Sequence, residues 1–265
     1  MREIIKKVRS GIVHINYMRG QEKIGSGSGF LSKQLLITCN HVIKVPYGST
    51  GIDILLRFDN EDPASKKDEL RYSYDEFMKY LVTGSYEESC DYAVFNIPVI
   101  KTMNRFNFEI GNPKDKAVGD DILFLGYPLE HNNLVCHKGT ISSFYKTGTV
   151  SIIQLDASIN QSNSGGPLID PDTGNVLGII TRKATGLTKL FTQFMEVFDK
   201  NIEAVKPSIG GVVLAGVDPI AAFMCSQIQM KKLGEEILRS ANVGIGYAFS
   251  IEHLSNDLAF ANFPK

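Results

Sequence analysis

Five consecutive residues, Asn163-Ser164-Gly165-Gly166-Pro167, constrain this chain more than any other stretch. A serine lies between an asparagine and two glycines, and the strand-like pair Leu168-Ile169 follows directly. Glycine adopts backbone conformations that other residues resist, and it lets another chain approach closely. The pattern therefore predicts a tight turn that presents one hydroxyl, that of Ser164.

A serine hydroxyl is a weak nucleophile unless a base removes its proton and nearby donors stabilise the oxyanion that forms. Two upstream segments offer partners: His41 follows the strand-like run Leu36-Ile37-Thr38, and Asp91 opens the run Asp91-Tyr92-Ala93-Val94-Phe95. We predict Ser164 as nucleophile, His41 as general base and Asp91 as the carboxylate that orients the imidazole. The structural alternatives are a turn serine, a buried histidine and an aspartate that opens a strand.

The chain order His41, Asp91, Ser164 is that of the chymotrypsin-type triad. Four stretches carry a resemblance to the trypsin-like serine peptidases, most closely to the HtrA-like protease domain without a PDZ domain. They are Gly27-Ser28-Gly29-Phe30-Leu31 (similar to "GSGF"), Ile37-Thr38-Cys39-Asn40-His41-Val42 ("TNxHV"), Asp91-Tyr92-Ala93-Val94 ("DxAV") and residues 156–167 ("DAAINxGNSGGP"). The resemblance covers residues 10–181 and resumes at 243–250. It implies a serine endopeptidase that works through an acyl-enzyme.

Short strand-like runs separated by Gly- and Asp-rich turns indicate an all-β protein. With the resemblance, we expect two six-stranded antiparallel β-barrels of chymotrypsin type. The N-terminal barrel would span residues 1–98, a connection 99–118, and the C-terminal barrel 119–265 with a mostly helical insertion at 182–242. The charged segment 59–76 is expected to be a surface loop.

The insertion shows helical spacing of apolar residues. A second helix is predicted to begin at Asp218-Pro219, an N-cap followed by proline at the first helical position. The first stripe consists of Phe191, Phe194, Met195, Phe198, Ile202 and Val205. The insertion would either pack on the second barrel or form a lid or docking surface for a protein partner or a second copy.

The resemblance places the oxyanion hole at the backbone N–H groups of Ser162 and Ser164. This chain departs from the family there, because the family has glycine where this chain has Ser162. A positive φ at a non-glycine residue costs on the order of 1 kcal/mol. We therefore hypothesise that the free enzyme is poorly organised at this turn and needs activation.

The substrate pocket is predicted to have two short walls, Ser158-Ile159-Asn160 and Ile179-Ile180-Thr181. These walls carry no acid of the trypsin kind and no histidine of the glutamate-specific kind. We expect a small or medium apolar residue before the cleaved bond, and a substrate backbone that pairs with the strand around Ile180 and Thr181.

Composition narrows the remaining functional classes. The net charge of -1 does not indicate the positively charged surface that binding to nucleic acid or to an anionic membrane requires. Neither a signal peptide nor a membrane span is evident, so a cytoplasmic location is expected. The spacings of the histidines and cysteines match no metal site, and no cofactor is expected.

The four cysteines (Cys39, Cys90, Cys136, Cys225) are expected to be reduced and mostly buried. The glycines at 25–29 are expected to form a strand-entry turn.

Three functions remain open. The first is a serine endopeptidase acting on proteins or peptides. The second is a catalytically weak or silent protease-like scaffold that binds peptides or a partner. The third is a hydrolase of small esters or amides that uses the same nucleophile.

Overall fold

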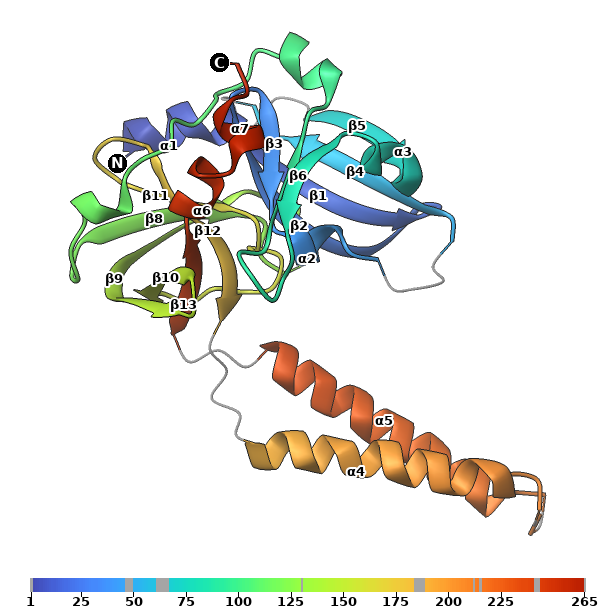
Figure 1. Cartoon of the computed structure of the whole chain (residues 1–265). Coiled ribbons are helices and arrows are strands. Elements are labelled where there is room, and N and C mark those ends of the chain that lie inside the picture. The colour runs from blue at the N-terminus through green and yellow to red at the C-terminus, as the bar shows by residue number, and fades with distance from the viewer. Residues whose placement is uncertain are drawn as a thin grey trace. The chain divides into compact units, whose positions relative to one another are not determined.

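A computed structural model describes residues 2–45, 50–60, 67–129, 131–183, 189–211, 213–214, 216–240 and 244–264. The chain divides into two compact units. Residues 1–183 and 244–265 form the first, here called the β unit, and residues 184–243 form the second, the helical hairpin. Figure 1 shows the two β-rich halves of the β unit and the paired helices of the hairpin.

The first half of the β unit is a seven-stranded antiparallel sheet with the order β5-β4-β1-β2-β3-β7-β6. Its strands are β1 (Ile12–Arg19), β2 (Glu22–Ser32), β3 (Leu35–Thr38), β4 (Ile52–Phe58), β5 (Asp68–Ser73), β6 (Leu81–Ser85) and β7 (Tyr92–Phe95). β5 and β6 are its two edges, so the hydrogen-bonded ladder stays open.

The helix α3 (Tyr74–Met78) connects these two edge strands and lies against β4 and β5. Its Phe77 is fully buried and stacks on Phe95 of β7, with ring centroids 4.3 Å apart. Tyr72 of β5 and Tyr80 meet edge to face beside it. Side-chain packing, instead of strand pairing, thus connects the two edges of the sheet.

The second half is a closed six-stranded antiparallel barrel with the order β10-β13-β12-β11-β8-β9. Its strands are β8 (Asp121–Gly126), β9 (Val135–Thr147), β10 (Val150–Asp156), β11 (Pro167–Ile169), β12 (Val176–Lys183) and β13 (Ile245–Ser250). Leu123, Leu125 and Ile179 of the barrel belong to the same buried cluster as the core of the first sheet. This shared core holds the loops of the two halves close to one another.

Short helices complete the β unit. They are α1 (Arg2–Val8), η1 (Arg9–Gly11), α2 (Asn40–Ile43), η2 (Pro98–Thr102), η3 (Pro113–Asp115), α6 (Glu252–Ser255) and α7 (Leu258–Ala261). Phe260 of α7 is buried in the core of the first sheet.

The expected six-stranded C-terminal barrel and the mostly helical insertion are confirmed. The expectation of an all-β protein with two barrels is wrong in two respects. The fold is mixed, because long helices occupy the hairpin and shorter ones occur through the β unit. The first half is an open sheet, because its edge strands β5 and β6 do not pair and are connected through α3. The charged segment 59–76 is also not simply a loop: β5 and most of α3 lie in it, and residues 61–66 are outside the described residues. The barrel boundaries at 98 and 118 stay predictions.

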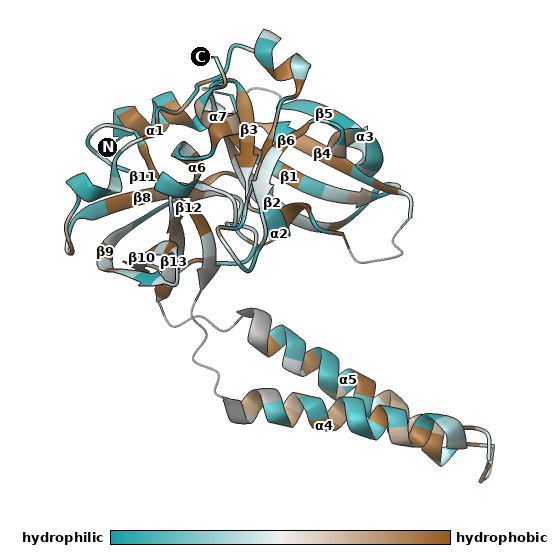
Figure 2. Cartoon of the chain, viewed as in Figure 1, coloured by the Kyte–Doolittle hydropathy of each residue, from teal (hydrophilic) through white to brown (hydrophobic). Residues whose placement is uncertain are grey.

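The helical hairpin consists of α4 (Lys189–Val205), η4 (Lys206–Ser208) and α5 (Pro219–Ser240). The predicted start of α5 is confirmed, because Asp218 Oδ1 accepts hydrogen bonds from the N–H groups of Ile220 (2.8 Å) and Ala221 (3.0 Å). Figure 2 shows hydrophobic and hydrophilic residues alternating along both helices. Among the described residues, no helix combines the length and apolarity that a membrane span requires.

Candidate active site

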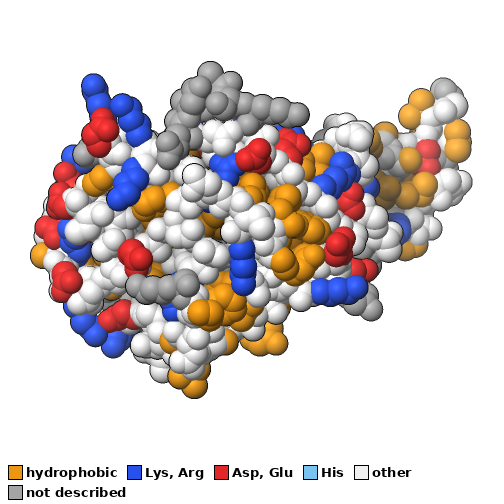
Figure 3. Space-filling view, turned by 90° about the horizontal axis from the view of Figure 1, so that it is seen from above, with side chains coloured by type: hydrophobic (Ala, Val, Ile, Leu, Met, Phe, Trp, Pro, Cys, Tyr) orange, Lys and Arg blue, Asp and Glu red, His pale blue; other side chains and the backbone are white. Residues whose placement is uncertain are grey.

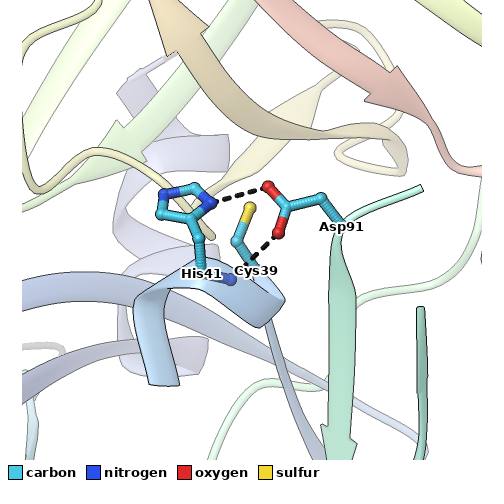
Figure 4. A group of neighbouring side chains, drawn as sticks. All are labelled: Cys39, His41 and Asp91. Carbon is cyan, nitrogen blue, oxygen red and sulfur yellow. Dashed lines mark hydrogen bonds and ion pairs between the residues drawn. The ribbon is translucent and has the colours of Figure 1, made fainter. Parts of the chain in front are cut away.

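His41 and Asp91 form the centre of the site. His41 belongs to the short helix α2 that follows β3, and Asp91 immediately precedes β7, the neighbour of β3. The His41 Nδ1 atom lies 2.6 Å from Asp91 Oδ2, and the His41 backbone N–H donates to Asp91 Oδ1 at 3.0 Å (Figure 4). The carboxylate accepts from Nδ1, so the proton is assigned to Nδ1 and Nε2 is left free to accept one.

Asp91 is fully buried, and its backbone has a positive φ of 48°. Burial by itself would raise the pKa of its carboxyl. The hydrogen bonds and charge of His41 outweigh burial and, with a bond from Thr181, hold that pKa below its ordinary value. The carboxylate therefore stays ionised and can stabilise a positive charge on the imidazole.

Thr181 on β12 connects both parts of the site. Its hydroxyl donates to Asp91 Oδ2 at 2.9 Å, and its carbonyl accepts the hydroxyl proton of Ser164 at 2.8 Å. The β12–β13 register shifts between Ile180 and Arg182, so Thr181 lies at an irregularity in the strand. This shift explains how one residue can present both its side chain and its carbonyl to the site.

Ser164 lies in the predicted turn. Gly166 N–H donates to the Asn163 carbonyl at 3.0 Å, which closes the turn, and Gly165 has a φ of 86°. A Cβ atom on Gly165 would come within 2.1 Å of the Ser28 carbonyl, so only glycine fits there. Ser164 and His41 line one common cavity. In the resting structure the Ser164 hydroxyl is directed to Thr181.

Residues Gln161 and Ser162 are here called the oxyanion turn, because the Ser162 N–H is a predicted oxyanion donor. Ser162 has a φ of 70°, in the left-handed region. Three hydrogen bonds hold it there. The Gln161 carbonyl accepts from the Leu129 N–H at 2.7 Å, the Ser162 carbonyl accepts from the Ser28 hydroxyl at 2.7 Å, and the Ser162 hydroxyl accepts from Ser26 at 3.1 Å. The N–H of a trans peptide points opposite to its C=O. The Ser162 N–H is therefore directed away from Leu129.

Ser28 on β2 is the main support of this turn. It is fully buried, and its N–H donates to the Ser164 carbonyl at 2.9 Å while its hydroxyl donates to the Ser162 carbonyl. The same hydroxyl accepts from the Tyr127 N–H at 3.0 Å. Ser28 thus fixes the carbonyls of both residues whose N–H groups are predicted to form the oxyanion hole.

A cavity of about 470 Å³ opens beside Ser164 and His41. Its walls come from the first sheet, α2 and the oxyanion turn. They are Tyr17, Arg19, Ile24, Gly25, Ser26, Val42, Lys44, Val45, Ile52, Gln161 and Ser162. A second cavity of about 320 Å³ lies on the β12 side and includes Thr181, Tyr247 and Phe249.

The six predicted pocket residues have different surroundings. Ile159, Ile179 and Ile180 are buried in the hydrophobic cores, and Ser158 is exposed. The Asn160 carbonyl accepts from the Asn163 N–H at 3.2 Å, which helps to shape the serine turn. Thr181 alone of the six lines one of the two cavities described above. The specificity pocket stays a prediction.

Cys39 lies close to His41 and Asp91, and the potential ligand atoms of the three residues are within 4.8 Å of one another (Figure 4). Burial raises the pKa of the Cys39 thiol well above its ordinary value, and the adjacent Asp91 charge acts in the same direction. A neutral thiol is a poor metal ligand, and His41 and Asp91 are already bonded to each other. All four cysteines are free as predicted, but Cys136 and Cys225 are exposed instead of buried.

Sequence reasoning missed the roles of Ser28, Ser26 and the Thr181 hydroxyl. The glycines at 25–29 were expected to form a strand-entry turn, but they lie inside β2. The sequence signal for Ser28 was its place between two glycines. These let β2 pass close to other groups, because a Cβ on Gly27 would come within 2.4 Å of Val42.

The trypsin-like peptidase domain family matches residues 27–179, which is more than half of the chain and includes His41, Asp91 and Ser164. The chain belongs to the trypsin-like peptidase family. The resemblance that the four motifs predicted is thereby confirmed.

Curated relatives are HtrA serine proteases. Serine protease HTRA3 from Homo sapiens is 27% identical over 244 residues, covering 82% of this chain and 49% of the relative. Serine protease Do-like HtrA from Bacillus subtilis (strain 168) is 29% identical over 174 residues, covering 60% of this chain and 34% of the relative. The chain thus spans about half the length, or less, of these relatives.

Solved structures show the same fold. The HtrA-type protease AlgW with a tripeptide aligns with a TM-score of 0.56 and 19% identity over 95% of this chain and 60% of AlgW. Deg5 aligns with a TM-score of 0.55 and 22% identity over 68% of this chain and 83% of Deg5.

Proposed function

We propose that the β unit of this trypsin-like peptidase is a serine endopeptidase domain that uses Ser164, His41 and Asp91. The observation that carries this proposal is the buried, ionised Asp91 bonded to His41 Nδ1, beside a cavity that His41 shares with Ser164. A structural aspartate and histidine would not need an accessible imidazole, whereas the side chain of His41 is 28% exposed.

The proposed reaction begins at Ser164. The Ser164 hydroxyl leaves the Thr181 carbonyl and gives its proton to His41 Nε2 as its oxygen attacks the substrate carbonyl carbon. The resulting oxyanion is stabilised by the Ser162 and Ser164 N–H groups. The C–N bond then breaks, His41 protonates the leaving amine, and an ester to Ser164 remains. Water, deprotonated by His41, hydrolyses this ester and restores the serine.

Substrates are proteins or peptides cleaved after a small or medium apolar residue. Support comes from the cavity on the β12 side. Its apolar lining residues are Tyr145, Val150, Ile152, Tyr247 and Phe249, beside the polar residues Glu88, Ser89, Thr147 and Thr181. The larger cavity between the first sheet and the oxyanion turn would take the leaving side of the substrate. A peptide library that showed strong preference for Arg, Lys or Glu before the cleaved bond would contradict this specificity.

A catalytically weak scaffold is the second candidate. One observation favours it: the Ser164 hydroxyl donates to Thr181, and the oxyanion turn contains a strained serine at position 162. An endopeptidase that needs activation is compatible with the same two facts.

A fluorophosphonate probe separates the candidates. The wild-type chain should be labelled covalently, and Ser164→Ala should not. The variant Ser208→Ala, at an exposed serine of the helical hairpin, serves as the matched control and should keep its label. Absence of labelling in the wild type would favour the scaffold. Cleavage of small esters without cleavage of any protein or peptide would favour a small-molecule hydrolase.

The proposed partners are protein substrates, not nucleic acid or membranes. On the face drawn in Figure 3, described cations and anions are interspersed, as the overall charge of -1 leads one to expect. A cytoplasmic location stays a prediction.

A further inference from the structure

The helical hairpin has a closed seam between its two helices. Gly234 of α5 is buried, and a Cβ atom there would lie 2.2 Å from the Met195 sulfur of α4. The Asn201 amide donates to Gln227 Oε1 at 2.9 Å, and Lys231 forms an ion pair with Asp199. These contacts place the middle of α4 antiparallel to the middle of α5.

Each helix also carries a second apolar stripe that faces away from this seam. Its residues follow the three- and four-residue steps of a helix face, and their exposed fractions range from 44% to 59%. They are Phe194 and Val197 on α4 and Phe223, Met230, Leu233 and Ile237 on α5.

The two outer stripes lie on the same side of the hairpin. Successive residues of a helix are rotated by about 100° around its axis. Around each axis, the outer stripe lies roughly 60–140° from the seam, and the direction of this rotation, followed along each chain from N- to C-terminus, is the same in both helices. When the hairpin is viewed from one end, successive residues run clockwise around one helix and anticlockwise around its antiparallel neighbour. Equal offsets therefore bring the stripes together into one surface, here called the outer face.

The opposite side of the hairpin is polar and mixed in charge. It carries Glu196, Lys200 and Glu203 on α4, and Lys232 and Glu236 on α5. A helix that binds an anionic membrane surface would concentrate Lys and Arg on its polar side. The acidic residues argue against a membrane as the occupant of the outer face.

The area of the outer face fits a second copy of the chain. From the exposed fractions, its six side chains leave about 600 Å² open, so two copies would bury about 1,200 Å², the lower end of specific interfaces. None of the six is charged, so two identical outer faces meet without charge repulsion. A two-helix layer with one apolar side is also half of a four-helix bundle.

We propose that the outer face of the helical hairpin is a homodimerisation surface, at which two copies of this chain form an antiparallel four-helix bundle. A two-fold axis brings the same patch of each copy into contact and closes the assembly at two. The inference does not depend on peptidase activity.

Sedimentation velocity of the full chain, from roughly 1 to 100 µM, tests the proposal, since interfaces of this size can dissociate in that range. We expect a concentration-dependent dimer for the wild type. Met230→Glu should raise the dimer dissociation constant more than about tenfold, because it places a carboxylate in an apolar contact. Gln229→Glu is the matched control: it adds the same charge one residue away, on the polar side, and should leave the constant unchanged.

Helicity by circular dichroism reports whether each variant is folded. If Met230→Glu loses helicity, Met230→Ser becomes the test variant and Gln229→Ser its control. Met230→Ser should also raise the dimer dissociation constant, but by a smaller factor. The proposal would be overturned if the wild-type chain stays monomeric at every concentration. It would also be overturned if the variant and its control lose the dimer equally. A monomer that cosediments with phosphatidylserine vesicles through the outer face would overturn it as well.

Discussion

The β unit and the helical hairpin differ in which side chains they bury. The β unit buries polar groups and pairs them: Asp91, Ser28 and Thr181 are almost inaccessible, and each bonds at least two other groups of the site. The hairpin leaves apolar residues exposed, such as Phe194 and Leu233. The difference fits the two proposals made above, in which the β unit carries the catalytic groups and the hairpin binds a second copy of the chain. Each prediction below tests this separation.

The largest effect is expected at Asp91. Asp91→Asn cannot hold the proton on His41 Nδ1 in the same way, so kcat should fall about 10⁴-fold. Asp59→Asn removes another buried carboxylate of the β unit, one that pairs with Arg9 and Lys67. This control should keep kcat, although it is expected to lower the melting temperature. Peptide hydrolysis measures both variants, and equal losses of kcat would reject the assigned role of Asp91.

Stability in acid should depend on His14, a fully buried residue of β1 that stacks on Tyr127. Burial, with the charges of Lys23, Arg57 and Lys67, lowers its pKa from 6.5 to about 3. The folded state binds the proton less readily than the unfolded state. Its stabilising effect is complete above pH 6.5 and is lost as the pH falls toward 3.

The variant His14→Phe should remove this loss. Between pH 7 and pH 4, wild type is expected to lose about 3 kcal/mol more unfolding free energy than the variant. His131→Gln, at an exposed histidine, should behave like wild type. Urea unfolding at each pH gives the comparison, and parallel curves for wild type and His14→Phe would refute the prediction. The hairpin contains no histidine, so the part of the pH dependence that His14 causes belongs to the β unit.

Ser28→Ala should lower kcat by about 10- to 100-fold, because the Ser162 carbonyl loses its donor and the oxyanion turn can shift. KM should change little. Ser32→Ala is the control on the same strand, where the buried hydroxyl donates to the Phe108 carbonyl far from the site. Both variants should lose stability by about 1–3 kcal/mol. A similar fall of kcat in Ser32→Ala would show that instability, not positioning, explains the result.

Ser162→Gly should raise basal kcat by up to about fivefold, the equivalent of about 1 kcal/mol of relieved backbone strain. The gain is limited because the Gln161 and Ser162 carbonyls keep their hydrogen bonds. Ser26→Ala removes only the bond to the Ser162 hydroxyl and gives the comparison. An unchanged kcat in Ser162→Gly would count against the hypothesis that this turn limits the resting enzyme.

The smallest effect on catalysis is expected from the hairpin. Replacing residues 186–240 with a short Gly-Ser linker should change kcat/KM on a short peptide by no more than about twofold, as for independent sites. The same variant should lose the dimer. A large loss of activity would instead support the alternative in which the insertion acts as a lid.

Local patterns predicted the local chemistry well. The turn around Ser164, the N-cap at Asp218 and the helical stripes of the insertion each depend on residues close in sequence. The segment 68–78 was missed, because its strand is an edge strand with few buried residues and its helix contains only five residues. The importance of Ser28 could not be read locally, since its hydroxyl bonds a carbonyl 134 residues away.

The sequence by itself determined the reactive groups and their order, because a motif prescribes residue types and turn chemistry over a few positions. Only the tertiary structure decided that one sheet stays open while the barrel closes, that Ser162 has a positive φ, and that both apolar stripes of the hairpin share a side. These features depend on which distant segments meet. Strand closure, hydrogen-bond partners and helix phase all follow from three-dimensional packing, which no short stretch of residues encodes alone.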